Sequence, residues 1–298
     1  MAYLFITAVL ILTSTCSIMM FYKLSQTPKQ TLSLKTRVQL MLTGLVSFIA
    51  DTVGIGSYVT NTAICKTLGL FEDDELPGVC NGAQTIPGAL SSIFFMRVVA
   101  VDFTMLFTLV AGACVGGILG GHFVSRLSIQ KVRLCMMLAF TAVAVVLFLK
   151  NIGYFVIDTE LTTLPITKLV FGFFAMMLCG ALTAVGMGLF AMVQAVLFLM
   201  GVSPAVAFPI MTTAGAMQQP LTTMVFLKRD RIPLQKTLIL SLTGCLGVLL
   251  ALPVISHLNT HWLHQLLFVI IVYNIINIAL SYRRKQHLIQ KILEPGPT

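Results

Sequence analysis

Two stretches of the chain decide its fold: residues 53–70 read VGIGSYVTNTAICKTLGL, and residues 185–202 read VGMGLFAMVQAVLFLMGV. They align without gaps at a shift of 132 residues, and three pairs of glycines coincide, at 54/186, 56/188 and 69/201. Farther along, Gly82-Ala83-x-x-x-Pro87 corresponds to Gly215-Ala216-x-x-x-Pro220 at nearly the same shift. The shared spacing of Gly and Pro predicts that the chain is an internal duplication.

The composition indicates that the main solvent of this chain is a lipid bilayer. Hydrophobic residues make up 57% of the 298 residues and charged residues only 10%, with a mean hydropathy of +0.96. Soluble globular domains carry roughly 25% charged residues. The first 22 residues are apolar and Lys23 follows them, which predicts an uncleaved transmembrane helix whose Lys23 end lies in the cytoplasm.

The chain is basic, with 19 Lys and Arg against 10 Asp and Glu and a formal net charge of +9. In a soluble protein this excess would indicate nucleic acid as a partner. Here the basic residues lie in short loops between apolar runs, so we expect them to set the orientation in the membrane, and we expect no nucleic acid partner.

The lengths of the apolar runs predict how often the chain crosses the membrane. A helix needs about 20 residues to cross the hydrocarbon core. Six runs fit one crossing each: 79–96, 103–125, 132–149, 205–227, 236–256 and 263–281. The runs 38–70 and 168–202 hold 33 and 35 residues, and each has a Gly-x-Gly near its centre. Each is either one broken, overlong span or a re-entrant hairpin.

The loop charges favour the hairpins. If both long runs re-enter, all basic segments lie in the cytoplasm, as the positive-inside rule requires: 23–37, 126–133, 228–236 and the tail from Arg283. The loops 151–166 and 257–264 then lie outside, and the acidic loop 72–75 becomes cytoplasmic. Each repeat contains one hairpin and three full spans, so the second copy starts from the opposite side and is inverted.

The predicted fold is therefore an all-α polytopic membrane protein, an inverted duplication of a hairpin-plus-three-helix unit with an extra N-terminal helix. Its expected parts are an N-terminal anchor with a basic loop (1–37), a first repeat (38–150), a linker (151–167), a second repeat (168–282) and a basic cytoplasmic tail (283–298). Inverted repeats with broken helices near the midplane are the usual construction of secondary transporters.

The glycine breaks are the first candidate site. At Gly54, Gly56 and Ser57 a second half-helix would begin, with Ser57 as a plausible N-cap, and Gly186 and Gly188 repeat the pattern. Glycines let a ligand approach backbone N–H groups at the positive end of a helix, which favours an anion. The alternative is that these glycines only permit tight packing of helices.

Polar side chains in the neighbouring runs are further candidates. They are Asn81, Gln84 and Thr85 beside Pro87, Thr212, Thr213, Gln218 and Gln219 beside Pro220, and Asn61 and Gln194 on the second arms of the hairpins. A proline inside a span frees a backbone carbonyl, and the nearby amides either satisfy that backbone or bind a substrate.

Asp51 is the only acidic residue well inside a predicted membrane segment, three residues before Gly54. An ionised carboxylate there is costly, so its default interpretation is functional, as a site that couples transport to a proton or cation. The alternatives are a protonated Asp51 or an ion pair with Arg97. Its counterpart in the second copy is Thr183.

The apolar run broken by Gly-Ile-Gly, the following Gly-Ala span, the basic turn and the repeat of the whole resemble the sulfite exporter TauE/SafE family over residues 38–282. The resemblance implies a bacterial cytoplasmic-membrane permease for sulfite, sulfonates or sulfoacetate, with its site at the paired hairpin tips. Carried onto this chain, the family's glycine-rich element is Gly54, Gly56 and Ser57, and Gly186 and Gly188. This chain departs from the family at Ser57-Tyr58 and Leu189-Phe190, where further glycines are usual.

Together these features predict a gradient-coupled secondary transporter rather than an enzyme. The expected partners are a small anionic substrate, membrane lipids and a coupling proton or cation, and the direction, export, is implied by the resemblance alone. A passive anion channel is the nearest alternative, followed by a membrane enzyme or scaffold. No catalytic, cofactor or metal motif occurs, and the oligomeric state cannot be deduced from the sequence.

Overall fold

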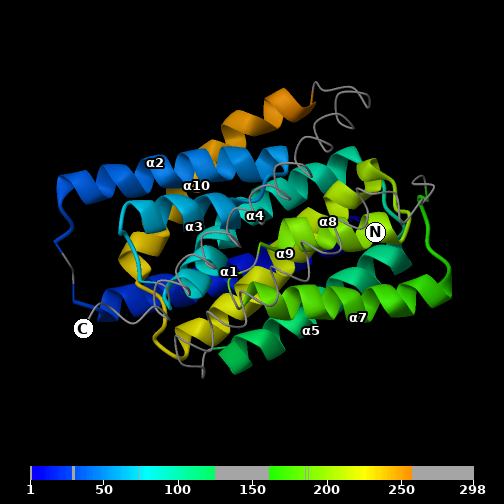
Figure 1. The fold of residues 1–298 in the computed structure, drawn as a ribbon, viewed down its shortest axis with the longest axis horizontal. Helices are drawn as coiled ribbons and strands as arrows, with labels where there is room; N and C mark the ends of the chain where they lie inside the picture. Colours follow the sequence, from blue (N-terminus) through cyan, green and yellow to red (C-terminus); the bar gives the residue numbers. More distant parts are fainter. Residues whose placement is uncertain are drawn as a thin grey trace, which may run out of the picture.

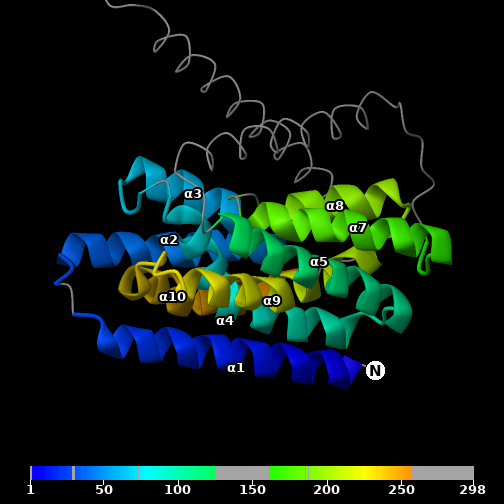
Figure 2. The same ribbon diagram turned by 90° about the horizontal axis from the view of Figure 1, so that it is seen from below.

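The computed structural model describes residues 2–28, 31–72, 74–124, 161–184, 186 and 188–256. Over these ranges the chain is built from helices: α1 (Ala2–Gln26), α2 (Leu34–Val53), α3 (Ser57–Thr67), α4 (Leu76–Val98), α5 (Phe103–Val124), α7 (Ile166–Thr183), α8 (Leu189–Leu199), α9 (Pro204–Leu227) and α10 (Leu234–Ser256). An isolated bridge pairs Leu161 with Val202. The helices lie along one long axis of the molecule (Figures 1 and 2).

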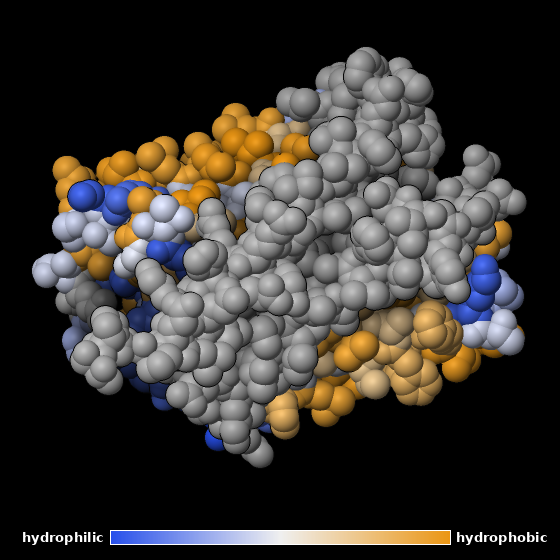
Figure 3. Space-filling view, in the orientation of Figure 1, coloured by the Kyte–Doolittle hydropathy of each residue, from blue (hydrophilic) through white to orange (hydrophobic). Residues whose placement is uncertain are grey.

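The protein is an all-α membrane protein. Within the described ranges, four helical segments are long and apolar enough to cross a bilayer: Tyr3–Gln26, Phe103–Phe123, Ile166–Thr183 and Leu234–Pro253. Large apolar side chains on α2, α5, α7 and α10 face outward, and Figure 3 shows hydrophobic surface along both long edges of the molecule, with hydrophilic residues gathered toward its ends. A surface this apolar is typical of contact with lipid.

Helices α4 and α9 form the centre of the bundle. They pack against each other, α10 covers α4, α5 covers α9, and α1 lies across both (Figure 2). Most of the residues of α4 and α9 are buried, polar ones such as Asn81 and Gln218 included. This polar content explains why neither helix is among the four apolar segments, although both have the length of a membrane span.

Four predicted crossings correspond to helices with boundaries within three residues: runs 79–96, 103–125, 205–227 and 236–256 are α4, α5, α9 and α10. The N-terminal helix continues past the predicted residue 22 to Gln26. The predicted crossings 132–149 and 263–281, the basic turn 126–133, residues 151–160 of the linker and the tail 283–298 lie outside the described residues.

Each long apolar run is broken at its Gly-x-Gly and folds back on itself. Helix α2 ends at Val53, Gly54 adopts a φ of 104°, and α3 begins at Ser57. In Figures 1 and 2, α3 runs back toward the end of the molecule where α2 began, and α8 does the same relative to α7. A φ of this sign costs little only for glycine, so the break is encoded locally.

Contacts between loops identify the two ends of the molecule. At one end, Lys23 pairs with Asp230 at 2.6 Å and Arg231 with Asp74 at 3.4 Å. These bonds join the end of α1, the α3–α4 loop and the α9–α10 turn. At the other end, the Leu161 N–H donates to the Gly201 carbonyl at 3.0 Å, which joins the start of α7 to the α8–α9 loop.

Candidate functional site

The two glycine breaks meet inside the protein. A Cβ atom added to Gly188 would lie 3.3 Å from Cβ of Tyr58, and one added to Gly56 would lie 3.7 Å from Cβ of Phe190. Both glycines are buried. The tip of each hairpin therefore contacts the first turn of the short helix in the other hairpin, and a bulkier residue at Gly188 would push the tips apart.

Asp51 closes a ring of hydrogen bonds at the first break. Its side chain is 1% exposed, Oδ1 accepts the Ser57 backbone N–H at 2.6 Å, and Oδ2 accepts Nε2 of Gln84 at 2.6 Å. The Ser57 hydroxyl donates to Oε1 of Gln84 and completes the ring. Side chains from α2, α3 and α4 are thus joined by direct hydrogen bonds.

The expected N-cap at Ser57 is wrong, because Ser57 is the first helical residue and Gly56 occupies the N-cap position. Gly56 has no side chain to cap the helix, and the carboxylate of Asp51 accepts the free N–H instead. A carboxylate at a helix N-terminus is stabilised by the positive end of the helix dipole. The expected alternative pair with Arg97 is not formed, since Arg97 is exposed in the last turn of α4.

Thr183, which the sequence alignment pairs with Asp51, makes different bonds. Its hydroxyl donates to the Gly180 carbonyl at 2.7 Å and accepts Nε2 of Gln218 at 2.7 Å. The Thr183 carbonyl accepts the Tyr58 hydroxyl at 3.0 Å and Nδ2 of Asn81 at 3.2 Å. The end of α7 is therefore held by side chains from α3, α4 and α9, and polar contacts run between the two hairpins.

Several buried amides around the breaks have atoms without a hydrogen-bond partner. They are Nδ2 and Oδ1 of Asn61, Nε2 of Gln194, Oδ1 of Asn81, Oε1 of Gln218 and Oε1 of Gln219. A buried polar atom left unpaired costs about 1–3 kcal/mol, and such atoms in native proteins normally bind water or a ligand. This set of unpaired amide atoms makes the region of the breaks a candidate binding site.

Of the remaining predicted site residues, Gly54 and Gly186 lie at the breaks and Thr85 lies away from them. Gly54 and Gly186 form the turns of the breaks, with φ of 104° and 103°. Thr85 is buried but bonds to the Asn81 carbonyl at 3.4 Å and contacts Sγ of Cys16 at 3.9 Å, so it faces α1 rather than the ring of Asp51.

The groups able to hold a ligand are neutral apart from Asp51. No Lys or Arg is buried among the described residues, and no cluster of His, Cys, Asp or Glu able to hold a metal was found in them. A ligand here would be bound by amides, hydroxyls and backbone N–H groups. Tyr58 was missed as a site residue, although a hydroxyl-bearing aromatic residue in an apolar run usually finds a partner when buried.

Comparisons with protein-family models, curated proteins and solved structures found no match to this chain. The assignment to membrane proteins and the candidate site therefore rest on the sequence and the structure alone.

Proposed function

We propose that the protein is a gradient-coupled secondary transporter that binds a small anion where the two glycine breaks meet, with alternating access to either side. The observation that carries this proposal is the contact of two helix breaks among buried amides whose polar atoms lack partners. Irregular backbone at membrane depth is stable where it lines a polar cavity, and secondary transporters bind substrates at such breaks.

The proposal includes an inverted duplication, and backbone angles support it. At a shift of 132 residues, Gly54 and Gly186 have φ of 104° and 103°, and Gly69 and Gly201 have φ of 62° and 83°. In Figure 1, α2 runs from the left end toward the middle and α7 from the right end toward the middle. Equivalent elements thus run in opposite directions, as an inverted repeat requires.

The packing of the helices supports the same duplication. If α2, α4 and α5 are equivalent to α7, α9 and α10, then the contact of α2 with α10 is equivalent to that of α7 with α5. Both contacts exist, and α10 on α4 is likewise matched by α5 on α9. Helix α1 has no equivalent in this scheme and contacts both α4 and α9, which fits an extra N-terminal helix.

The hairpins are proposed to be re-entrant. The ion pair of Arg231 with Asp74 brings the α3–α4 loop to the end of the molecule that holds Lys23 and the α9–α10 turn. A single broken span from 38 to 70 would instead carry that loop to the opposite end. With re-entry, the described basic loops share one side, which the positive-inside rule assigns to the cytoplasm.

We propose the N-terminus of α8 as the anion position. The first N–H groups of a helix have no partner within the helix and lie at the positive end of its dipole. In α3, Asp51 binds one of these groups. In the second hairpin the equivalent residue, Thr183, bonds to Gly180 and Gln218 instead. A substrate anion would therefore bind the N-terminus of α8 in the position that the Asp51 carboxylate takes at the N-terminus of α3.

Asp51 is proposed as the coupling site. As a carboxylate it accepts hydrogen bonds from Ser57 and Gln84, and protonation would weaken both bonds. The tip of the first hairpin would then be less firmly held against α2. A proton on Asp51 would in this way alter the contact between the two tips.

The class of substrate and the direction enter the proposal through the resemblance to the sulfite exporter TauE/SafE family. On that basis the transported anion is sulfite or a sulfonate such as sulfoacetate, and the protein exports it across a bacterial cytoplasmic membrane. Neutral amides and backbone N–H groups suit such anions, because they bind oxyanions without a fixed positive charge.

Transport into proteoliposomes tests the proposal. We expect saturable flux of sulfite or a sulfonate that responds to a proton gradient, and a strong reduction of that response in Asp51→Asn. Gly56→Ala should abolish flux, whereas Gly69→Ala should not. Both glycines have positive φ, with values of 92° and 62°, and no atom lies within 3.4 Å of the added Cβ of either.

Gly69→Ala is a control for a positive φ away from the tip, because Gly69 follows the last turn of α3 at the far end of the hairpin. Flux that rises linearly with anion concentration would show a passive channel and contradict alternating access. Normal flux in Gly56→Ala would exclude the tips as the site, and unchanged gradient response in Asp51→Asn would remove its coupling role.

A further inference from the structure

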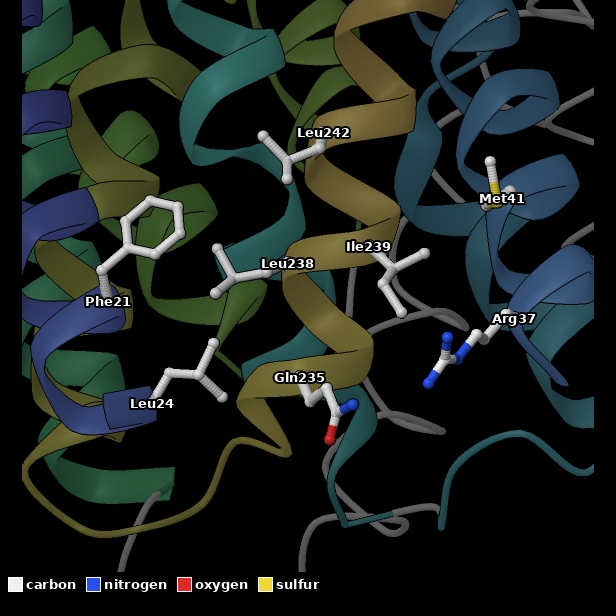
Figure 4. A pocket seen from close by; sticks show the side chains of 8 residues that line it. All are labelled: Phe21, Leu24, Arg37, Met41, Gln235, Leu238, Ile239 and Leu242. Atoms are coloured by element: carbon white, nitrogen blue, oxygen red, sulfur yellow. The ribbon is translucent and has the colours of Figure 1, made fainter. Parts of the chain in front are cut away.

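A groove on the outer surface lies between α1, α2 and α10, away from the glycine breaks. Its volume is about 450 Å³, within the roughly 300–1,000 Å³ of small-molecule sites. Figure 4 shows its lining, with α10 between α1 on one side and α2 on the other. The lining residues are Phe21, Leu24, Arg37, Met41, Gln235, Leu238, Ile239 and Leu242.

The polarity of the lining changes along the groove. Arg37 and Gln235 lie in the first turns of α2 and α10, at the end of the molecule that carries Lys23. Met41, Ile239 and Leu242 lie one or two turns farther into the bundle, and Figure 4 shows them on the side of the groove away from the loops. The lining is therefore mainly apolar, and its two polar side chains, Arg37 and Gln235, lie at the end of the groove that is nearer the loops.

The polar end is positively charged and open to a ligand. Arg37 is exposed, and its guanidinium group has no ion-pair or hydrogen-bond partner among the described residues. Lys35 precedes it by two residues, and no acidic side chain lines the groove. Both α2 and α10 begin at this end, so the positive ends of their dipoles add to the charge of Arg37.

We propose that this groove binds an anionic phospholipid of the leaflet on the Lys23 side. The phosphate group would bind Arg37 and Gln235, and an acyl chain would lie along Met41, Ile239 and Leu242. A guanidinium group matches a phosphate with two parallel hydrogen bonds, and basic pockets between helices on the cytoplasmic side favour such headgroups. The apolar wall explains why the occupant is a lipid rather than free phosphate.

Native mass spectrometry of the full chain in detergent tests the lipid site. We expect the wild type to bind dioleoyl phosphatidylglycerol more tightly than dioleoyl phosphatidylcholine, which has the same acyl chains. Arg37→Gln should weaken binding of phosphatidylglycerol about fivefold and leave phosphatidylcholine unchanged, because one basic residue near the surface contributes about that factor. Arg97→Gln, which removes an exposed arginine outside the groove, is the matched control and should change neither.

A second pair of variants tests the apolar wall. Leu242→Trp should fill the groove and weaken binding of both lipids, whereas Leu119→Trp on α5 should not. Both leucines are more than half exposed, at 51% and 58%, so neither change disturbs the core. Equal binding of the two lipids by the wild type, equal losses in Arg37→Gln and Arg97→Gln, or unchanged binding in Leu242→Trp would each overturn the proposal.

Discussion

Among the described residues, Asp51 is the one with an ionisable acidic or basic side chain that is buried in the interior. A lone carboxylate in an apolar medium would be expensive, and here two hydrogen bonds and the end of α3 offset part of that cost. The same bonds give Asp51 a structural role beside its proposed coupling role, since it joins α2, α3 and α4. Its two roles can be separated by comparing substitutions.

Asp51→Ala should lower the free energy of unfolding more than Asp51→Asn does. Alanine leaves the Ser57 N–H and Nε2 of Gln84 without acceptors, at a cost of about 1–3 kcal/mol for each group. Asparagine still accepts the Ser57 N–H, and its amide nitrogen can donate to Gln84 once that amide rotates. Thermal unfolding in detergent measures the difference.

Equal losses of stability in the two variants would contradict this ring of hydrogen bonds. Loss of coupling in Asp51→Asn at nearly normal stability would separate the proposed coupling role of the carboxylate from its structural one.

At the scale of elements, glycines set the distance between the paired helices. On α5, a Cβ at Gly116 would lie 1.8 Å from the Met177 carbonyl oxygen of α7. On α10, a Cβ at Gly247 would lie 2.5 Å from the Leu45 carbonyl oxygen of α2. In a bilayer, where apolar burial does not drive association, such close approach is a main source of helix–helix stability.

Gly116→Ala should therefore destabilise the protein by about 1–3 kcal/mol, since the clash is with backbone and neither helix can yield without moving. Gly247→Ala should do the same at the other helix pair. Gly215→Ala is the matched control, because its Cβ would meet the nearest atom at an ordinary 3.5 Å. Gly215→Ala should leave the free energy of unfolding unchanged or raise it by up to about 1 kcal/mol, because alanine favours a helix more than glycine does.

Denaturation in mixed detergent micelles measures these changes. If Gly116→Ala were as stable as Gly215→Ala, α5 and α7 would not pack as closely as the structure shows.

At the scale of the whole molecule, the ion pairs at one end and the backbone bonds at the other define two faces. The α3–α4 loop and the α9–α10 turn share a face through Arg231 and Asp74, while Leu161 and Gly201 share the opposite one. The proposed re-entrant arrangement, and with it the proposed inverted duplication, depends on this division.

Labelling of single cysteines with a membrane-impermeant maleimide tests the division in cells, in a chain without its seven native cysteines. We expect Glu72→Cys and Arg229→Cys to react only from the cytoplasmic side, and Thr163→Cys only from the outside. All three residues are exposed, so lack of reaction reflects sidedness rather than burial. Reaction of positions 72 and 163 from the same side would contradict the re-entrant hairpins.

Within the described residues, the sequence by itself determined that the protein belongs in a membrane, where its helices lie and where the two long apolar runs break. Apolar composition requires a bilayer, runs of about 20 residues become spans, and Gly-x-Gly interrupts the two runs that are too long. These features are local, because each depends on residues close together in the chain. Helices α4 and α9 were therefore predicted within three residues of their ends.

Only the tertiary structure decided what the breaks contact. Tyr58 donates to the carbonyl of Thr183, 125 residues away, and Gln84 binds Asp51 across 33 residues. The cap on α3 comes from Asp51 rather than Ser57 for the same reason, since the carboxylate reaches the helix only after the chain has folded back. Such bonds depend on how helices distant in the chain are placed against each other, and no local pattern of residues encodes that placement.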